Sequence, residues 1–170
     1  MSVLELLKFK KGSDEICQTG LMGIVITALK EEDWSVERDS ERSDLLRVGV
    51  KGRNTDMRGT FLVRQEKDQV IFYVHLPNKA PEGRQREAME FITRANYGIN
   101  IGNFEMDLQD GDIRFKVALD VEAGVLSSTM VRNMMLVAFL TVDRYFPGLM
   151  SVLFGNVIPA VAVREIEASE

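Results

Sequence analysis

The chain has 170 residues, about the length of one domain, of which 45% are hydrophobic and 28% are charged. This composition is typical of a globular protein and excludes collagen-like, disulfide-scaffold and long disordered classes. The formal net charge of −5 argues against a broad nucleic-acid footprint, so we expect no nucleic-acid partner.

The N-terminal region bears on compartment and on domain limits. Residues 1–16 read as a lead-in and lack the long apolar stretch of a secretory signal. Cys17 is the single cysteine, which excludes an intramolecular disulfide and a zinc site built on several cysteines. We therefore expect a cytoplasmic protein with one domain over residues 17–165.

The first elements follow from apolar spacing. Leu21, Val25 and Leu29 recur at helical intervals, which predicts a helix over residues 19–32. Residues 45–51 alternate between apolar and polar side chains and predict a strand, and a further strand could begin at Trp34.

A hairpin is predicted where two alternating runs, 60–66 and 70–76, flank a turn at residues 67–68. The predicted register sets Val63 opposite Phe72 and Phe61 opposite Val74. These four side chains would form one apolar face.

A second helix is predicted after Pro81, with Gly98 as its stop signal. Its buried face would consist of Ala88, Phe91, Ile92 and Ala95.

A second hairpin is predicted over residues 102–120, because Asp110-Gly111 favours a tight two-residue turn between alternating runs. The predicted register pairs Leu108 with Ile113, Met106 with Phe115, Phe104 with Val117, Asp107 with Arg114, and Glu105 with Lys116. Apolar side chains would then meet on one face and opposite charges on the other.

Ser127 is a candidate N-cap for a third helix that we expect to end near Phe146, because Pro147-Gly148 follows. A short helix over 149–154 and an apolar tail over 157–163, either strand or helix, complete the chain. Residues 145–163 carry no charge, but glycine and proline interrupt them. We therefore expect residues 147–163 to be a buried C-terminal segment and expect no membrane span.

The predicted fold class is α+β. Most strands are neighbours in sequence, which favours an antiparallel sheet with helices packed on it. The predicted order is α-βββ(β)-α-ββ-α-tail.

Few residues are suited to catalysis. His75 is the only histidine, and we expect a structural or surface role for it. Cys17 reads as an idle or buried thiol. The acidic residues between Asp107 and Glu122 do not fit a calcium-loop spacing, and turn formation explains them. We expect no enzyme activity, no metal site and no cofactor.

The most distinctive apolar stretch is residues 134–142, which carry no charge on any side of the predicted helix. A one-sided sheet covers only one stripe of such a helix, so we expect the C-terminal segment or a second subunit to cover the rest. The candidate interaction or dimer surface consists of Met134, Met135, Val137, Ala138, Phe139, Leu149, Leu153 and Phe154.

Three segments carry a family resemblance: NYGINIGNFEMD at 96–107, DGDIRF at 110–115 and DRYFPG at 143–148. With them, residues 20–160 resemble the YbjN family, in particular its cyanobacterial-type members. That family is similar in fold to type III secretion chaperones, which are dimers that hold extended client segments on apolar patches. The resemblance implies the same order of elements and supplies no catalytic residue.

The functional expectation is a non-enzymatic interaction module, chaperone-like or regulatory, that acts as a homodimer and binds another protein. The alternative is a regulatory domain that senses a small molecule bound under the C-terminal segment.

Overall fold

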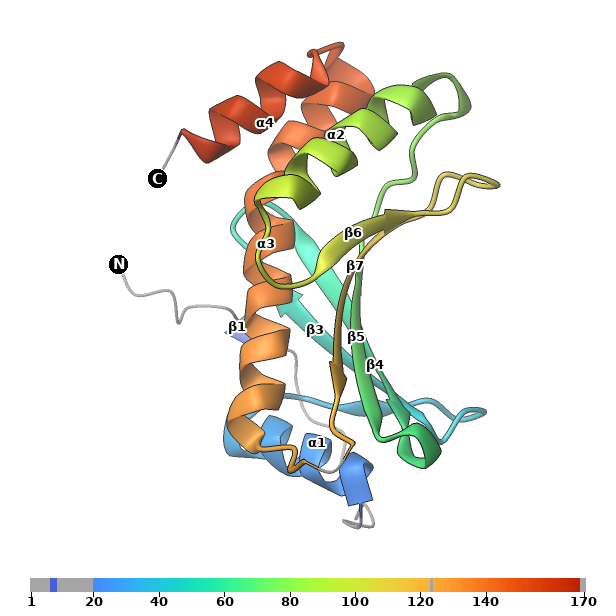
Figure 1. Cartoon of the computed structure of the whole chain (residues 1–170), viewed down its shortest axis with the longest axis vertical. Coiled ribbons are helices and arrows are strands. Elements are labelled where there is room, and N and C mark those ends of the chain that lie inside the picture. The colour runs from blue at the N-terminus through green and yellow to red at the C-terminus, as the bar shows by residue number, and fades with distance from the viewer. Residues whose placement is uncertain (1–6, 9–19, 123, 169–170) are drawn as a thin grey trace.

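The computed structural model describes residues 7–8, 20–122 and 124–168 (Figure 1). One antiparallel sheet has the strand order β1-β3-β4-β5-β7-β6, and β2 also pairs with β3. The strands are β1 Leu7–Lys8, β2 Glu37–Arg38, β3 Leu45–Lys51, β4 Asp56–Arg64, β5 Gln69–His75, β6 Asn103–Met106 and β7 Ile113–Asp120. The helices are α1 Gly20–Glu31, α2 Gln85–Gly98, α3 Ser128–Gly155 and α4 Pro159–Glu167, with short 3-10 turns η1 Gln65–Lys67 and η2 Glu82–Arg84.

This arrangement confirms the predicted α+β class and the predicted order of helices and strands. Helix α3 runs along one face of the sheet, with α1 near its N-terminal end and α2 and α4 near its C-terminal end (Figure 1). β1 lies inside the stretch that we expected to precede the domain.

The core forms between α3 and the apolar face of the sheet. Phe72 and Phe139 are fully buried and meet edge to face at 5.3 Å, and Trp34 stacks on Phe139 at 5.8 Å. Gly59 permits this packing, because a Cβ atom there would overlap the Phe72 ring. The aromatic cluster thus joins α3, the central strands and the segment after α1.

The first hairpin keeps its predicted face but not its predicted register. Phe61 pairs with Phe72 and Val63 with Val70, a shift of two residues. Four residues, rather than two, form the connection: η1 followed by Asp68, whose φ of 49° is left-handed. A shift of two preserves the alternation, so Phe61, Val63, Phe72 and Val74 still share the buried face.

The second hairpin departs from prediction in the same way. Phe104 pairs with Phe115 and Met106 with Ile113, so the connection is six residues long. The side chain of Asp107 accepts the Gln109 N–H at 2.8 Å, and Asp110 forms an ion pair with Lys79. These contacts widen the loop, so the predicted pairing of Asp107 with Arg114 is wrong.

Gly111 explains why the wide loop replaces the tight turn. Its φ is +74°, and its carbonyl accepts the Ala80 N–H at 2.8 Å. A Cβ atom at this position would overlap the Ala80 carbonyl oxygen. The loop is therefore shaped by its packing on the segment before α2. Sequence spacing within the hairpin does not reveal that contact.

The predicted end of the third helix is also wrong. Ser127 is its N-cap as expected and accepts the Met130 N–H at 3.2 Å, but α3 continues through Pro147 to Gly155. A proline inside a helix leaves the carbonyl four residues earlier without its N–H donor. Here Nδ2 of Asn54 donates to the Asp143 carbonyl oxygen at 2.8 Å and replaces that donor.

Asp143 holds the β3–β4 turn through its side chain as well. Its carboxylate accepts the backbone N–H groups of Arg53, Asn54 and Thr55 at 3.2, 2.8 and 3.3 Å. The residues 149–154 that we expected as a separate helix are thus the last turns of α3. The tail after Asn156 forms helix α4.

One described helix, α3, is long and apolar enough to cross a membrane by length and composition alone. A core helix passes the same test, and α3 buries ten side chains within this fold, including Met135, Phe139 and Val142. The uncharged stretch 145–163 is divided between α3 and α4 by Asn156, whose φ is 56°.

We predict that Phe115→Ala destabilises the protein by about 3–5 kcal/mol, because Phe115 is fully buried and packs on Phe104 at 4.9 Å. Lys116→Ala on the opposite face of β7 is the matched control and costs under about 1 kcal/mol. Chemical denaturation measures both changes in the free energy of unfolding. Equal losses for the two variants would show that the faces of β7 are wrongly assigned.

We predict that Asn54→Ala lowers the free energy of unfolding by about 0.5–1.5 kcal/mol, because the Asp143 carbonyl loses its donor. The same change in a Pro147→Ala background has a smaller effect, because Ala at 147 supplies a helical N–H. A double-mutant cycle by denaturation measures this coupling. Additive effects would contradict the assigned role of Asn54.

Candidate interaction surfaces

The structure places most of the predicted interaction surface in the core of the monomer. Val137 is half-buried, and Phe154 keeps 57% of its surface exposed. The other predicted residues are at most 3% exposed: Met134, Met135, Ala138, Phe139, Leu149 and Leu153. The sheet and the other helices therefore cover much of the apolar circumference of α3 that we assigned to self-association. Replacing the buried Leu153 by a charged residue would therefore disturb folding and would not probe a binding surface.

One side of α3 remains uncovered by the described residues. We call Met130, Val137, Leu140 and Pro147 the outer strip, because their spacing places them along one helix face. Met130 and Leu140 are 37% and 43% exposed, and Pro147 is also exposed. Sequence periodicity did not identify Leu140 and Met130 as surface residues. In a helix that is apolar all round, the pattern does not distinguish the buried side from the exposed side.

An open hollow of about 790 Å³ continues the outer strip toward α4. Leu140, Pro147 and Gly148 form its α3 wall, the turn with Arg53 and Asn54 forms a second wall, and Ala162 and Ile166 of α4 form a third. The hydrogen bonds of Asp143 with the turn hold the first two walls together. The hollow thus lies beside the C-terminal segment, where the alternative hypothesis expects a ligand.

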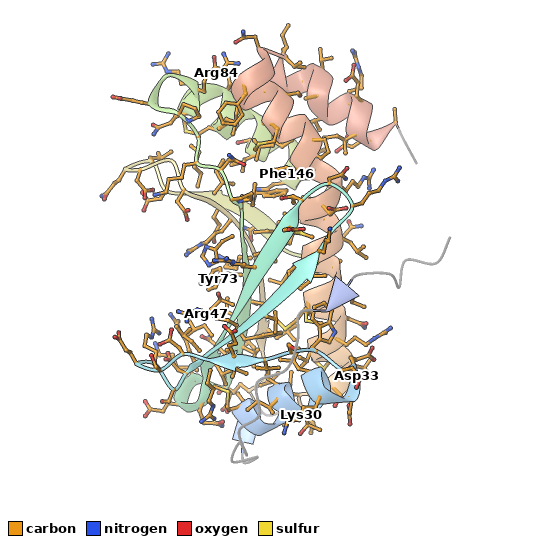
Figure 2. The ribbon with its side chains drawn as sticks, turned by 180° about the vertical axis from the view of Figure 1, so that it is seen from behind. Lys30, Asp33, Arg47, Tyr73, Arg84 and Phe146 are labelled. Atoms are coloured by element: carbon orange, nitrogen blue, oxygen red, sulfur yellow. The ribbon has the colours of Figure 1, made fainter. Side chains whose placement is uncertain are left out.

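The sheet has a second, polar face turned away from α3, which we call the open face. Figure 2 shows Tyr73 and Arg47 on this side. The guanidinium of Arg114 lies over the Tyr73 ring at 4.3 Å, and Glu105 pairs with both Arg114 (2.9 Å) and Lys116. Glu105 is opposite Arg114 in the strand register, so the predicted register pairing of Glu105 with Lys116 is wrong, but the expected contact between Glu105 and Lys116 forms as an ion pair.

The side-chain charges of the open face affect each other. Partial burial opposes the effect of the two cations, and on balance Lys116 and Arg114 lower the pKa of Glu105 below its usual value. His75 lies next to Arg114 across β5 and β7. Partial burial lowers the pKa of His75, Asp112 opposes that shift, and Arg114 adds to it. His75 therefore favours its neutral form more than an exposed histidine does.

The described residues hold no arrangement typical of an active site. They contain no group of three or more histidine, cysteine or acidic side chains that could hold a metal ion. His75 contacts the ring of Tyr73 at 6.3 Å between centroids, and its strand neighbours are Arg58 and Arg114. Cys17 lies outside the described residues.

Comparison with known proteins identifies the family of the chain. No curated protein matches the chain. A solved structure entitled "Crystal Structure of the ExsC-ExsE Complex" is similar over 75% of this chain and 94% of that chain, with 13% identity and a TM-score of 0.48. Residues 23–150 match the family YbjN, described as "Putative bacterial sensory transduction regulator". Because this match covers most of the chain and confirms the resemblance carried by residues 96–148, the protein belongs to the YbjN family.

Proposed function

We propose that this protein is a non-enzymatic protein-interaction module, of a regulatory or chaperone-like kind, that acts as a homodimer in the cytoplasm. The outer strip of α3 is the observation that carries the proposal. It exposes Met130, Leu140 and Pro147 on one helix face, with Val137 partly exposed between them. The description of the YbjN family as a regulator supports the same class of function.

The position of the strip suits a two-fold interface. Leu140 lies near the middle of the 28-residue helix α3, so two copies packed antiparallel would place it near the symmetry axis. Met130 and Pro147 are about 25 Å apart along the helix at 1.5 Å per residue. Contact over that length together with the flanking hollow is compatible with the roughly 1,000 Å² that a specific interface buries.

The residue inventory supports a function without catalysis. The whole chain contains one histidine and one cysteine, so few combinations of nucleophile and base are available. The neighbours of His75 across β4 and β7 are Arg58 and Arg114, and Asp112, the carboxylate that acts on its pKa, forms no hydrogen bond or ion pair with it among the described residues. A histidine that acts as a general base is usually oriented by a carboxylate.

The second candidate function is ligand sensing by the hollow beside α4. The hollow has both apolar walls and polar groups, among them Arg53, Asn54 and Ser151. Such a mixture is typical of small-molecule sites. Native mass spectrometry of the purified protein separates the two functions, because a co-purifying metabolite favours the sensor and an empty dimer favours the interaction module.

We predict that the wild-type protein sediments at micromolar concentration as a species of about twice 19.2 kDa. Leu140→Asp shifts it to the monomer, because a carboxylate would have to be desolvated in the interface. Val125→Asp is the matched control, since Val125 is 83% exposed and lies outside the strip. Circular dichroism verifies that both variants fold. A 19.2 kDa wild-type species, or a dimer that persists in folded Leu140→Asp, would contradict the proposed interface.

A further inference from the structure

We propose that the open face of the sheet docks an acidic amphipathic segment of a protein partner. This inference rests on the proposed function of protein binding, but it assigns the partner to a surface other than the outer strip. The two surfaces lie on different sides of the molecule, because α3 covers the opposite face of the sheet (Figures 1 and 2).

The strand registers bring the basic side chains of the open face together. Thr60, Tyr73 and Lys116 are opposite one another across β4, β5 and β7, and Arg47 continues that row on β3. The next row contains Arg58, His75 and Arg114. Adjacent strands lie about 4.8 Å apart, so Arg58 and Arg114 flank His75 within about 10 Å of each other.

Positive charge exceeds negative charge on this face, although the whole chain has 21 basic and 26 acidic residues. Alternation along β3 to β7 places these basic side chains on it: Arg47, Lys51, Arg58, Arg64, Arg114 and Lys116. The acidic side chains on the same face are Glu37, opposite Arg47 on β2, and Asp56, Glu105 and Asp120.

The centre of the face is where this excess is least compensated. Glu105 is shared by two cations, Arg114 and Lys116. Arg58 is exposed and has no ion-pair partner among the described residues, whereas Arg47 pairs with Asp39 at the rim. Arg58, Arg114 and Lys116 thus lie around Tyr73 and His75, and the carboxylates near them are Glu105 and Asp112. A partner that brings further carboxylates would complement this charge.

Apolar side chains next to the cations define the rest of the partner. Leu45, Leu62, Ile71 and Ala118 form the row beside Tyr73, and Leu62 is only half-buried. A segment that contacts both rows needs apolar as well as acidic side chains. A nucleic acid fits less well, because Arg114 already covers a face of the Tyr73 ring on which a base would stack.

The neighbouring edge of the sheet favours docking on the face over strand addition at β6. Asn96 caps the outer side of Phe104, with Oδ1 accepting the Phe104 N–H at 2.8 Å and Nδ2 donating to the Phe104 carbonyl at 3.1 Å. An incoming strand would have to displace this side chain.

The test uses fluorescence anisotropy with a labelled synthetic peptide that alternates glutamate pairs with leucine and phenylalanine, and a matched peptide with glutamine at every glutamate. We expect the acidic peptide to bind the full-length protein at least about tenfold more tightly than the glutamine peptide. The double variant Arg58→Gln/Arg114→Gln loses most of that preference. The control double variant Arg86→Gln/Arg94→Gln removes the same amount of charge from α2 and retains the preference for the acidic peptide.

Each outcome tests the docking surface independently of the proposed homodimer. Equal binding of the two peptides, or an unchanged preference in the folded open-face variant, overturns the acidic docking surface. Equally tight binding of a single-stranded DNA oligonucleotide that also depends on Arg58 and Arg114 overturns the choice of a protein partner. The Leu140→Asp variant distinguishes this proposal from the homodimer. If the variant is monomeric and still prefers the acidic peptide, the docking surface does not depend on dimer formation.

Discussion

Burial of one long apolar helix against one apolar sheet face is the constraint on which the fold depends. Phe139 contacts both Trp34 and Phe72, so a single helical position connects α3 to the segment after α1 and to the middle of the sheet. Because α3 is 28 residues long, α1 can pack near one of its ends and α2 and α4 near the other. The helices therefore gather on one side, and the sheet keeps a polar face on the other.

That one-sidedness has functional consequences. A helix that is apolar on most of its circumference presents the sheet with more apolar surface than one face can cover. The excess becomes the outer strip around Leu140. The opposite side of the sheet is free of helices among the described residues, and its strands expose arginine, lysine and tyrosine side chains. Self-association and partner binding can thus use separate surfaces of one small domain.

Asp143 and Asn54 show how a distant contact supports the long helix. They are 89 residues apart, and Asn54 donates two hydrogen bonds to Asp143: its backbone N–H to the carboxylate and its Nδ2 to the carbonyl oxygen. The second bond replaces the one that Pro147 cannot form. This bond therefore supports α3 at the place where the sequence pattern predicted its end.

The sequence by itself determined the types of most elements and the faces that they bury, whereas it left the tail 157–163 open between strand and helix. Helical and strand periodicities identified Phe91 and Ile92 on α2 and Phe61 and Phe72 on the sheet, and these depend only on local geometry. Ser127 was predictable as an N-cap for the same reason, since capping involves residues within one turn. The scarcity of reactive side chains was also visible in the composition.

Only the tertiary structure decided the strand registers, the path of the chain through Pro147 and the surfaces left exposed. Both hairpins are shifted by two residues, because their loops form hydrogen bonds and contacts that alternation does not encode, as between Gly111 and Ala80. The exposure of Leu140 and the burial of Leu153 could not be distinguished in sequence, since both are leucines of one apolar helix. What separates them is which side of α3 meets the sheet and α2, and that is set by packing between segments far apart in the chain.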